Sequence, residues 1–284
     1  MSPEQITPQL FVTDLDGTFL DPAGAVTETN LQAVRHAGEA GIATVIATGR
    51  PLRILTAIES LRELNPLLIS CNGAIVKRLA DEELLHVHEL ETALAMAVAT
   101  ELREEIGERV NFAVEYPTGW AREPGYLPNP KFADADQITD VNDALASDQP
   151  VVKLLVQTKG LPTNVLDEIA TPIANERLTT TYSSITDDGL LEIGAPGISK
   201  ASALRQLLVD LAIPAEAVAA FGDMPNDLEM LQLVGMPYRM ADCHHALEVC
   251  GFPCAGSNAE SGVGHTMLRL LAGEGYGEQA KSPR

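Results

Sequence analysis

The stretch "LFVTDLDGTFLD", residues 10–21, places two carboxylates directly after an apolar run. Residues 10–13 have the composition of a buried strand, and Asp14 and Asp16 follow two positions apart, before Gly17. Asp-Gly is also a common turn dipeptide, so a simple hairpin corner would account for these residues. The rest of the chain has to decide between a turn and a functional site.

The composition is that of a globular protein with a substantial core. The 284 residues are 45% hydrophobic and 21% charged, which allows one large domain or two ordinary ones. The 19 basic and 40 acidic residues give a formal net charge of −21. This charge disfavours binding to nucleic acid or to an anionic membrane. An anionic substrate would therefore need a local positive site, such as a metal ion or selected Lys and Arg residues.

The sequence contains no evident targeting or membrane signal. Residues 1–9, "MSPEQITPQ", are polar and lack the basic region of a signal peptide. No apolar run approaches the roughly 20 residues that a membrane-spanning helix needs. We therefore expect a soluble cytoplasmic protein with four free cysteines. Cys243, Cys250 and Cys254 lie near two histidines, but their spacing is not a standard zinc pattern.

Strand and helix patterns alternate near the start of the chain and again near its end. Repeated strand–helix–strand units predict a parallel sheet between two layers of helices. The expected elements of this part are strands at residues 9–14, 42–49, 66–74 and 217–223, and helices at 27–41, 50–64, 197–213, 226–235 and 262–273.

The middle of the chain, residues 84–188, has a different pattern. Adjacent strands without an intervening helix favour an α+β module with an antiparallel sheet. The expected elements here are helices at 91–107 and 161–175, strands at 109–116 and 150–158, two strands within 178–194, and a long Pro- and Gly-rich loop at 117–137. The chain is thus predicted to be an α/β core interrupted by an inserted module.

Polar side chains follow several of the expected core strands, at the point where each strand ends. Asp14, Thr48, Asn72 and Asp223 all occupy such positions. The binding crevice of an open parallel sheet lies beyond the carboxyl ends of its strands, so we expect these residues to converge. Lys200, at the start of an expected helix, can join them. A turn explains one such residue, but it does not explain acids, a hydroxyl group and a lysine at one edge.

This set of residues suits the chemistry of phosphoryl transfer. Oxygen ligands from Asp14, Asp223 and a backbone carbonyl would suit Mg²⁺. A carboxylate can act as a nucleophile if Mg²⁺ and Lys200 screen its charge and that of the phosphate. Asp16 could protonate a leaving oxygen and later deprotonate a water molecule. Thr48 and backbone N–H groups could hold the phosphoryl oxygens.

These motifs resemble those of the haloacid dehalogenase superfamily of phosphohydrolases, and best its Cof-type group with a class IIB α/β cap. The first family motif, Asp-x-Asp-x-Thr, matches "DLDGT" at residues 14–18. The second, a Ser or Thr after an apolar strand, matches Thr48 in "IATGR", and the third matches Lys200 in "GISKASAL". The fourth, Gly-Asp-x-x-Asn-Asp, matches "GDMPND" at residues 222–227.

The resemblance implies a fold and an activity. The fold is α/β: a Rossmann-like parallel-sheet core, residues 1–83 and 189–284, with an inserted α+β cap domain, residues 84–188, that selects the substrate. The activity is Mg²⁺-dependent hydrolysis of small phosphorylated metabolites, such as sugar phosphates or cofactor phosphate monoesters, through an aspartyl phosphate. No nucleic acid or membrane partner is implied, and the oligomeric state stays open.

The resemblance also implies a role for each matching residue. Asp14 is the expected nucleophile and a Mg²⁺ ligand. Asp16 is the expected general acid/base and would bind Mg²⁺ through its backbone carbonyl. Asp223 would be the third protein ligand, and Asp227 would orient the metal site from nearby or through water. Thr48 and Lys200 belong to the expected catalytic set. The residues expected to bind the phosphoryl group or the substrate are Thr48, Gly49, Arg50, Asn72, Lys200 and Asn226.

Two other classes of function use the same motifs. A phosphotransferase such as a phosphomutase would share the nucleophile Asp14 and the acid/base Asp16. A non-enzymatic phospho-accepting or metal-binding module could share the fold, but such a slow switch gains nothing from an acid/base group at Asp16.

Several residues near the expected site allow two interpretations. Arg50 could bind substrate or cap its own helical region. Trp120, Arg122 and Tyr126 could line a substrate pocket or belong to a surface loop that folds on itself. Cys71 is expected to pack at a strand end rather than to act as a nucleophile. Residues 240–242, "MAD", stand where members of the family usually have "GNA".

Overall fold

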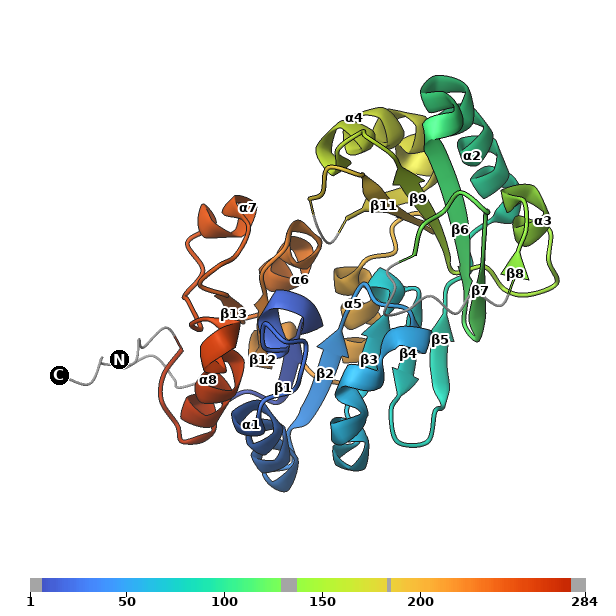
Figure 1. Cartoon of the computed structure of the whole chain (residues 1–284). Coiled ribbons are helices and arrows are strands. Elements are labelled where there is room, and N and C mark those ends of the chain that lie inside the picture. The colour runs from blue at the N-terminus through green and yellow to red at the C-terminus, as the bar shows by residue number, and fades with distance from the viewer. Residues whose placement is uncertain (1–6, 129–136, 183–184, 277–284) are drawn as a thin grey trace.

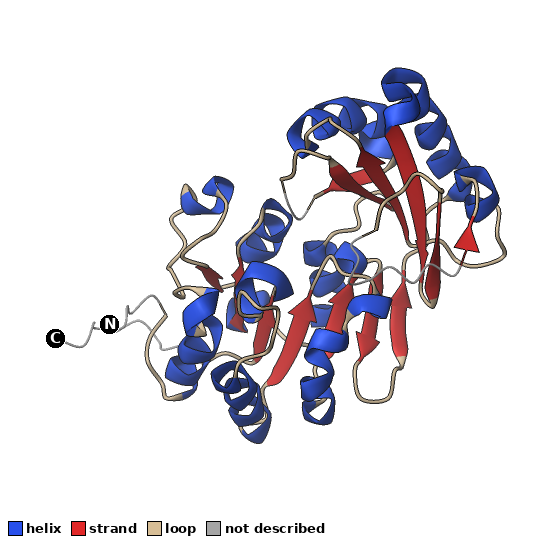
Figure 2. Ribbon diagram, viewed as in Figure 1, coloured by secondary structure: helices blue, strands red, loops and turns tan. Residues whose placement is uncertain are grey.

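The computed structural model describes residues 7–128, 137–182 and 185–276 (Figure 1). Two β-sheets organise this part of the chain, one in the core and one in the cap (Figure 2). The core sheet has the strand order β13-β12-β1-β2-β3-β4-β5. Its strands are β1 (Leu10–Thr13), β2 (Ala43–Ala47), β3 (Leu67–Ser70), β4 (Ile75–Arg78), β5 (Leu84–Val87), β12 (Val218–Gly222) and β13 (Met236–Arg239).

The five strands from β13 to β3 are parallel, and β4 and β5 are antiparallel additions at one edge. The central strand, β1, pairs with β12 on one side and β2 on the other, with Leu10 opposite Val218 and Ala43. Successive residues of β1 pack into different apolar clusters, Phe11 into one and Val12 into the other. Both faces of the sheet are therefore buried, which explains why its strands are almost wholly apolar.

Helices cover the two faces of the core sheet, as the alternating pattern predicts (Figure 1). The helix α1 starts after Thr27, whose hydroxyl accepts from the N–H of Asn30, and such a cap satisfies one otherwise unpaired donor. The core helices are α1 (Glu28–Glu39), α5 (Lys200–Asp210), α6 (Leu228–Leu233), α7 (His245–Glu248) and α8 (Gly262–Leu271). The parallel α/β core is confirmed.

Residues 50–64, which the sequence predicts as one helix, instead form 3₁₀ segments at Leu52–Ile54 and Thr56–Leu64. A leucine or isoleucine stands at every third position from residue 52 to residue 64. A 3₁₀ helix has three residues per turn, so this spacing places all of them on one side. Ile58 and Leu61 are fully buried on that side. The repeat of three, rather than 3.6, accounts for the difference.

The cap sheet has the strand order β10-β11-β9-β6-β7-β8 and is antiparallel except for the pair β7–β8. One of its faces packs against the cap helices in a single apolar cluster, and these helices lie on the side away from the core (Figure 2). The cap elements are α2 (Thr92–Ile106), β6 (Val110–Tyr116), β7 (Gly119–Arg122), β8 (Gln137–Ile138), α3 (Val141–Leu145), β9 (Lys153–Thr158), α4 (Thr163–Ala174), β10 (Thr179–Thr181) and β11 (Leu190–Gly194).

The strand pairing moves each expected domain boundary by one strand. The expected limits, 84–188, assign β5 to the cap and β11 to the core. Instead, β5 pairs with β4 in the core sheet, and β11 pairs with β9 in the cap sheet. The acidic turn before β5 and the Asp-Gly pair before β11 have the composition of linkers, but each connects strands within one sheet.

The segment 117–137, predicted as a long loop, contains the strand β7 and the first residue of β8; residues 129–136 of that segment lie outside the described ranges. All four cysteines are free thiols, as expected. Within the described ranges, none of the helices combines the length and the apolar character that a membrane span requires.

Candidate functional site

The carboxyl ends of the central core strands bring the predicted site residues to one edge of the sheet, where a cavity of about 510 Å³ lies between core and cap. Asp14 follows β1, and its backbone N–H donates to the carbonyl of Phe221 in β12 (2.9 Å). Thr48 follows β2, and its carbonyl accepts from the N–H of Asn72, after β3 (3.1 Å). The convergence expected from the sequence is therefore present.

Three aspartates form a compact acidic cluster at this edge. One carboxylate oxygen from each of Asp14, Asp223 and Asp227 lies within 4.8 Å of the others. Lys200 is 1% exposed, and its Nζ donates to Oδ1 of Asp14 (2.5 Å) and to Oδ1 of Asp227 (2.7 Å). Ser199 caps the N-terminus of α5 and so fixes where Lys200 enters the site.

The loop after β1 approaches the cluster closely. Thr18 donates its hydroxyl hydrogen to Oδ1 of Asp223 (2.7 Å). Gly17 has φ +76°, and a Cβ there would lie 2.4 Å from Oδ2 of the same aspartate. Glycine is therefore required at this position, both for the left-handed backbone and for the space that Asp223 occupies.

Asp227 is fully buried, and its two oxygens already have partners. Oδ2 accepts from the backbone N–H groups of Asp223 (3.1 Å) and Met224 (3.0 Å). Oδ1 accepts from Lys200. These bonds hold the loop after β12 and orient the neighbouring aspartate. The orienting role expected for Asp227 would use bonds of this kind.

Burial and mutual repulsion make the cluster unfavourable without a cation. Burial raises the pKa of Asp14 well above its ordinary range, and Lys200 only partly opposes this rise. Burial likewise raises the pKa of Asp223 to about 6, against the hydrogen bond from Thr18. Burial alone would lower the pKa of Lys200, but Asp14 and Asp227 outweigh it and the pKa rises. The lysine therefore stays charged.

The donor set of this cluster fits a hard divalent cation. It consists of carboxylate oxygens, with neither sulfur nor imidazole nitrogen among them, and such ligands suit Mg²⁺. Three carboxylates face one ammonium group, so a cation would relieve the excess negative charge. Within the described residues this is the one group of three potential metal ligands, and Cys243, Cys250 and Cys254 take no part in it.

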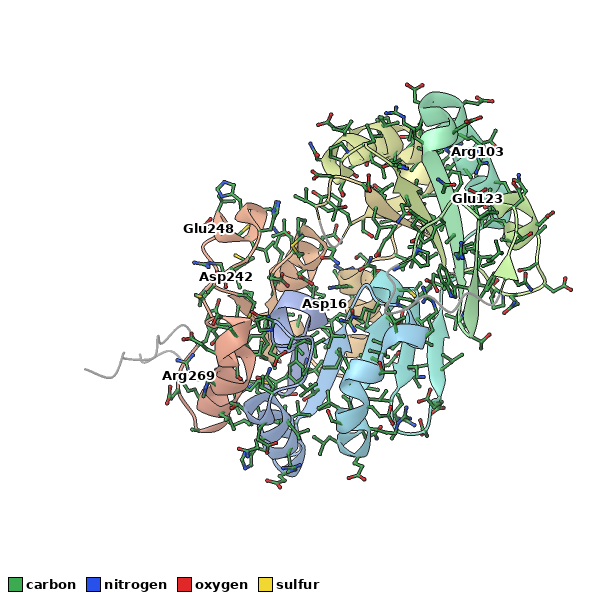
Figure 3. The ribbon with its side chains drawn as sticks, in the orientation of Figure 1. Asp16, Arg103, Glu123, Asp242, Glu248 and Arg269 are labelled. Carbon is green, nitrogen blue, oxygen red and sulfur yellow. The ribbon has the colours of Figure 1, made fainter. Side chains whose placement is uncertain are left out.

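Asp16 is not part of the acidic cluster. It lies on the loop after β1, at the core edge that faces the cap (Figure 3), and its side chain is 55% exposed. Arg50 donates from Nε to Oδ2 (2.7 Å) and from Nη2 to Oδ1 (2.5 Å) of this carboxylate. Arg50 also donates to the carbonyl of Ile54. The bond to Ile54 is a contact with its own helical segment, which is one of the two interpretations of Arg50. The contact with Asp16 belongs to neither interpretation.

The loop after β2 arranges Thr48 for hydrogen bonding into the cavity. Thr48 is 1% exposed, and its Oγ1 accepts from the backbone N–H of Arg50 (3.1 Å). Because this bond uses a lone pair, the hydroxyl can donate its hydrogen to a phosphoryl oxygen. The carbonyl of Gly49 accepts from Nζ of Lys153, which belongs to the cap strand β9 (2.6 Å).

Asn72 contacts the cap rather than the centre of the site. Its Nδ2 donates to Oγ1 of Thr181 (2.9 Å) and to Oε2 of Glu192 (2.6 Å), which uses both amide hydrogens. Its Oδ1 accepts from Nδ2 of Asn226 (3.1 Å). Asn226 lines the cavity, and its Oδ1 is buried without a hydrogen-bond partner among the described residues.

The cap contributes side chains that the sequence did not single out. Glu115 of β6 is 1% exposed and accepts two hydrogen bonds from Arg53 of the core (3.0 and 2.5 Å). Lys153 and Glu192 form a second ion pair (2.7 Å). In "VVKLLVQT" and "LLEIG" the alternation of side chains along the strand places these charges on the face opposite the apolar cluster. This alternation is the sequence pattern from which their position could have been predicted. Trp120 lines the cavity, with the guanidinium carbon of Arg53 4.0 Å from its ring centroid.

A family model described as haloacid dehalogenase-like hydrolase matches residues 11–267 of the chain. A 5-amino-6-(5-phospho-D-ribitylamino)uracil phosphatase of Bacillus subtilis is 26% identical over 264 residues, covering 92% of this chain and 94% of its own. An HMP-PP phosphatase of Cronobacter sakazakii is 26% identical over 273 residues, covering 91% and 94%. A pyridoxal phosphate phosphatase of Escherichia coli is 23% identical over 270 residues, covering 91% and 97%.

Solved structures share the whole fold. The protein SMU.1108c from Streptococcus mutans superposes with a TM-score of 0.81 at 23% identity, covering 94% of this chain and 100% of its own. A subclass IIB sugar phosphatase of the same superfamily gives a TM-score of 0.78 at 18% identity, covering 92% and 98%. The similarity extends over core and cap together, so the predicted fold class is confirmed.

Proposed function

Because the chain belongs to the haloacid dehalogenase-like hydrolase family and is a Cof-type phosphatase, we propose that it is a Mg²⁺-dependent phosphohydrolase acting through an aspartyl phosphate. Its substrates are small phosphorylated metabolites, of the sugar phosphate or cofactor phosphate class. The observation that carries the proposal is the position of Lys200, which lies 2.5 Å from Asp14 inside a buried cluster of aspartates.

Asp14 is the proposed nucleophile. It lies at the end of β1 and lines the cavity, where a phosphate ester could be bound beside it. An oxygen of its carboxylate attacks phosphorus while the bond to the leaving oxygen breaks. Lys200 holds the attacking carboxylate in place through Oδ1 and offsets the charge that gathers as the phosphoryl group approaches.

Asp16 is the proposed acid/base group. It lines the same cavity two residues after Asp14, and in its protonated form it gives a proton to the leaving alcohol. As a carboxylate it then removes a proton from water, which attacks the phosphorus of the aspartyl phosphate and regenerates Asp14. Arg50 orients this side chain through two hydrogen bonds.

Asp14, Asp223 and the backbone carbonyl of Asp16 are the proposed ligands of Mg²⁺, with Asp227 and Thr18 orienting the set. When bound, Mg²⁺ would neutralise part of the charge of the carboxylates and of the phosphoryl group. The donor chemistry of the acidic cluster supports this assignment.

Thr48 and Lys200 are the proposed phosphoryl-binding residues. The hydroxyl of Thr48 is free to donate because Arg50 occupies a lone pair. Asn226 supplies a buried oxygen without a partner among the described residues, which could accept a hydrogen bond from the substrate. The amide hydrogens of Asn72 are used in contacts with the cap, so we assign it to the cap interface instead.

The cap forms the wall of the leaving-group space. Trp120, Tyr126, Leu155 and Leu190 line the cavity on the cap side. Apolar and aromatic walls with a few charged groups are typical of small-molecule sites. The relatives are named as phosphatases of 5-amino-6-(5-phospho-D-ribitylamino)uracil, HMP-PP and pyridoxal phosphate. The cavity of about 510 Å³ suits compounds of this kind.

The test is a panel of phosphate esters, each incubated with the purified protein in Mg²⁺ and in EDTA, with released phosphate as the readout. We expect Mg²⁺-dependent release from a few related esters, and none from the Asp14→Asn variant. Phosphoryl transfer to an added sugar without release of free phosphate would instead identify a phosphotransferase. An absence of both reactions would overturn the proposal.

A further inference from the structure

Four residues connect the cap to the loops at the core edge, and we call Gly49, Asn72, Lys153 and Glu192 the cap–core network. Nζ of Lys153 donates to the carbonyl of Gly49 (2.6 Å) and to Oε2 of Glu192 (2.7 Å). Nδ2 of Asn72 donates to the same carboxylate oxygen (2.6 Å). Two loops of the core are thus bonded to two adjacent strands of the cap.

The network buries charge that the cap alone would leave in water. Lys153 is 2% exposed and Glu192 is 9% exposed. Both lie on the face of the cap sheet opposite its apolar cluster, where Gly49 and Asn72 of the core contact them. Burial alone would lower the pKa of Lys153, but Glu192 outweighs it and the pKa rises. The ammonium group therefore stays charged although it is buried. A neutral side chain would cost less free energy to bury at this position.

The carbonyl that Lys153 holds lies in the middle of residues 48–50, which we call the phosphate-binding loop. Gly49 stands between Thr48, which lines the cavity, and Arg50, whose guanidinium holds Asp16. The N–H of Arg50 donates to Oγ1 of Thr48, so the two flanking residues are also bonded to each other. A shift of the Gly49 carbonyl would move both of them.

We propose that Lys153 is a positioning residue, which acts through the Gly49 carbonyl to set Thr48 and Arg50, and through Arg50 the carboxylate of Asp16. The geometry of the acid/base group then depends on whether the cap is seated on the core. This inference rests on the proposed phosphohydrolase function for its kinetic consequence, whereas its structural consequence for the loop does not depend on that function.

The kinetic consequence is a loss of turnover rather than of binding. A misplacement of reacting groups by about 1 Å costs on the order of 100-fold in rate. In Lys153→Met, which keeps the length of the side chain and removes the donor, we expect kcat for p-nitrophenyl phosphate to fall about 10- to 100-fold. KM should change less than kcat, because Lys200, the other proposed phosphoryl-binding residue, does not depend on the Gly49 carbonyl for its position. Lys153→Arg, which restores a charged donor, should recover most of the lost kcat.

Lys77 provides a matched control for the loss of a buried lysine. It is 6% exposed, pairs with Glu82, and lies on β4 outside the lining of the cavity. Lys77→Met therefore removes a buried charge of the same kind without touching the phosphate-binding loop. We expect it to lower the melting temperature and to leave kcat unchanged.

Hydrogen exchange gives a readout that needs no activity. The amides of Cys71 and Asn72 donate to the carbonyls of Arg50 and Thr48 (3.1 Å each), so their exchange reports how firmly the loop is held. These amides should exchange faster in Lys153→Met and at the wild-type rate in Lys77→Met, at equal fractions of folded protein. If Lys153→Met does not fold, Lys153→Gln, a donor of shorter reach, takes its place with the same expectation.

The two proposals fail in different ways. If the wild-type protein releases no phosphate, the proposed function fails, and the exchange of the loop amides still decides whether Lys153 positions the loop. If the wild type is active and Lys153→Met keeps its kcat and its exchange rates, the positioning role is wrong. If Lys77→Met loses as much kcat as Lys153→Met, the effect is a general loss of stability and the positioning role is likewise wrong.

Discussion

Arg50 holds the carboxylate of Asp16 through two parallel hydrogen bonds, with Nε 2.7 Å from Oδ2 and Nη2 2.5 Å from Oδ1. This bond joins the loop after β2 to the loop after β1. The predicted acid/base group is 55% exposed, so little except Arg50 limits where its carboxylate points. The geometry of proton transfer therefore depends on a side chain from a second loop.

Replacement of Arg50 by lysine should lower kcat about 10-fold, because an ammonium group cannot reproduce the planar two-point contact with Asp16. Steady-state kinetics on the best ester of the panel would measure this. Arg62→Lys is the matched control, since Arg62 makes the same kind of paired contact with the exposed Glu59 away from the cavity. Equal kcat values for Arg50→Lys and the wild type would exclude the orienting role.

Asp14→Asn should abolish turnover and also stabilise the protein in EDTA. Burial raises the pKa of Asp14 well above its ordinary range, so its ionised form is unfavourable beside two other carboxylates. An amide removes that charge and fits the same space, and a higher melting temperature without metal is expected. The exposed Asp242→Asn is the control. Activity in Asp14→Asn would refute the nucleophile, whereas an unchanged melting temperature would refute the electrostatic argument.

Asp16→Asn should reduce turnover by about 100-fold or more while leaving the fold intact, because an amide cannot exchange a proton with the leaving oxygen or with water. Its exposure means that little packing is lost. Circular dichroism and the melting temperature would check the fold, and single-turnover kinetics would check both chemical steps. An inactive variant without a melting transition would be unfolded, which would contradict the expected intact fold. Turnover at the wild-type rate would contradict the acid/base role of Asp16.

The core and the site could be predicted from the sequence, because both depend on local signals. Alternating strands and helices determine the parallel sheet. Because the carboxyl ends of its strands lie at one edge, Asp14, Thr48 and Asp223 come together there whatever the details of packing. Glu115 and Lys153 could not be predicted in the same way. On an alternating strand a charged residue is normally solvated, whereas these two are buried where the cap meets Arg53 and the Gly49 carbonyl of the core.

The cap strand β7 could not be predicted from its local sequence either. β7 lies within a Pro- and Gly-rich segment that predicts a loop, yet Trp120 is 1% exposed there. Its burial comes from the neighbouring strand β6 and from Arg53 of the core, and Arg53 is distant in sequence. Tertiary contacts therefore outweigh the local preference.

Cys71 should resist alkylation in the folded protein, whereas Cys250 should react. Burial raises the pKa of Cys71 to about 11, so little thiolate is present at pH 8, and its side chain is also inaccessible. Cys250 is exposed. Mass spectrometry of peptides after brief iodoacetamide treatment would compare them, with the unfolded protein as the control in which both react. Fast modification of Cys71 in the native state would show that it is a reactive thiol and not a packing residue.

Gly17→Ala should destabilise the protein and weaken Mg²⁺ binding. The left-handed backbone costs about 1 kcal/mol for alanine, and the new Cβ would lie 2.4 Å from an oxygen of Asp223. That aspartate would have to move, and with it the hydrogen bond from Thr18. Gly24→Ala is the control, since Gly24 has φ +81° and nothing within 4 Å of a Cβ. Equal Mg²⁺ affinity in the two variants, measured by calorimetry, would show that the close approach at Gly17 has no bearing on the metal site.

The stability of the metal-free protein should fall as the pH rises through the window from about 4 to about 6. Burial raises the pKa of Asp223 to about 6, whereas the unfolded chain releases this proton near pH 3.9. In that window the folded state holds more protons than the unfolded state, so raising the pH favours unfolding. A shift of roughly 2 units corresponds to about 3 kcal/mol at most.

Urea denaturation in EDTA at pH 4.5, 5.5, 6.5 and 7.5 would measure this fall, and Asp223→Asn should flatten it. Mg²⁺ competes with protons for the same carboxylates, so it should raise the free energy of unfolding strongly at pH 7.5 and little at pH 4.5. If Mg²⁺ stabilised the protein equally at both values, it would bind away from Asp14 and Asp223. The acidic cluster would then need another explanation than the metal site proposed for it.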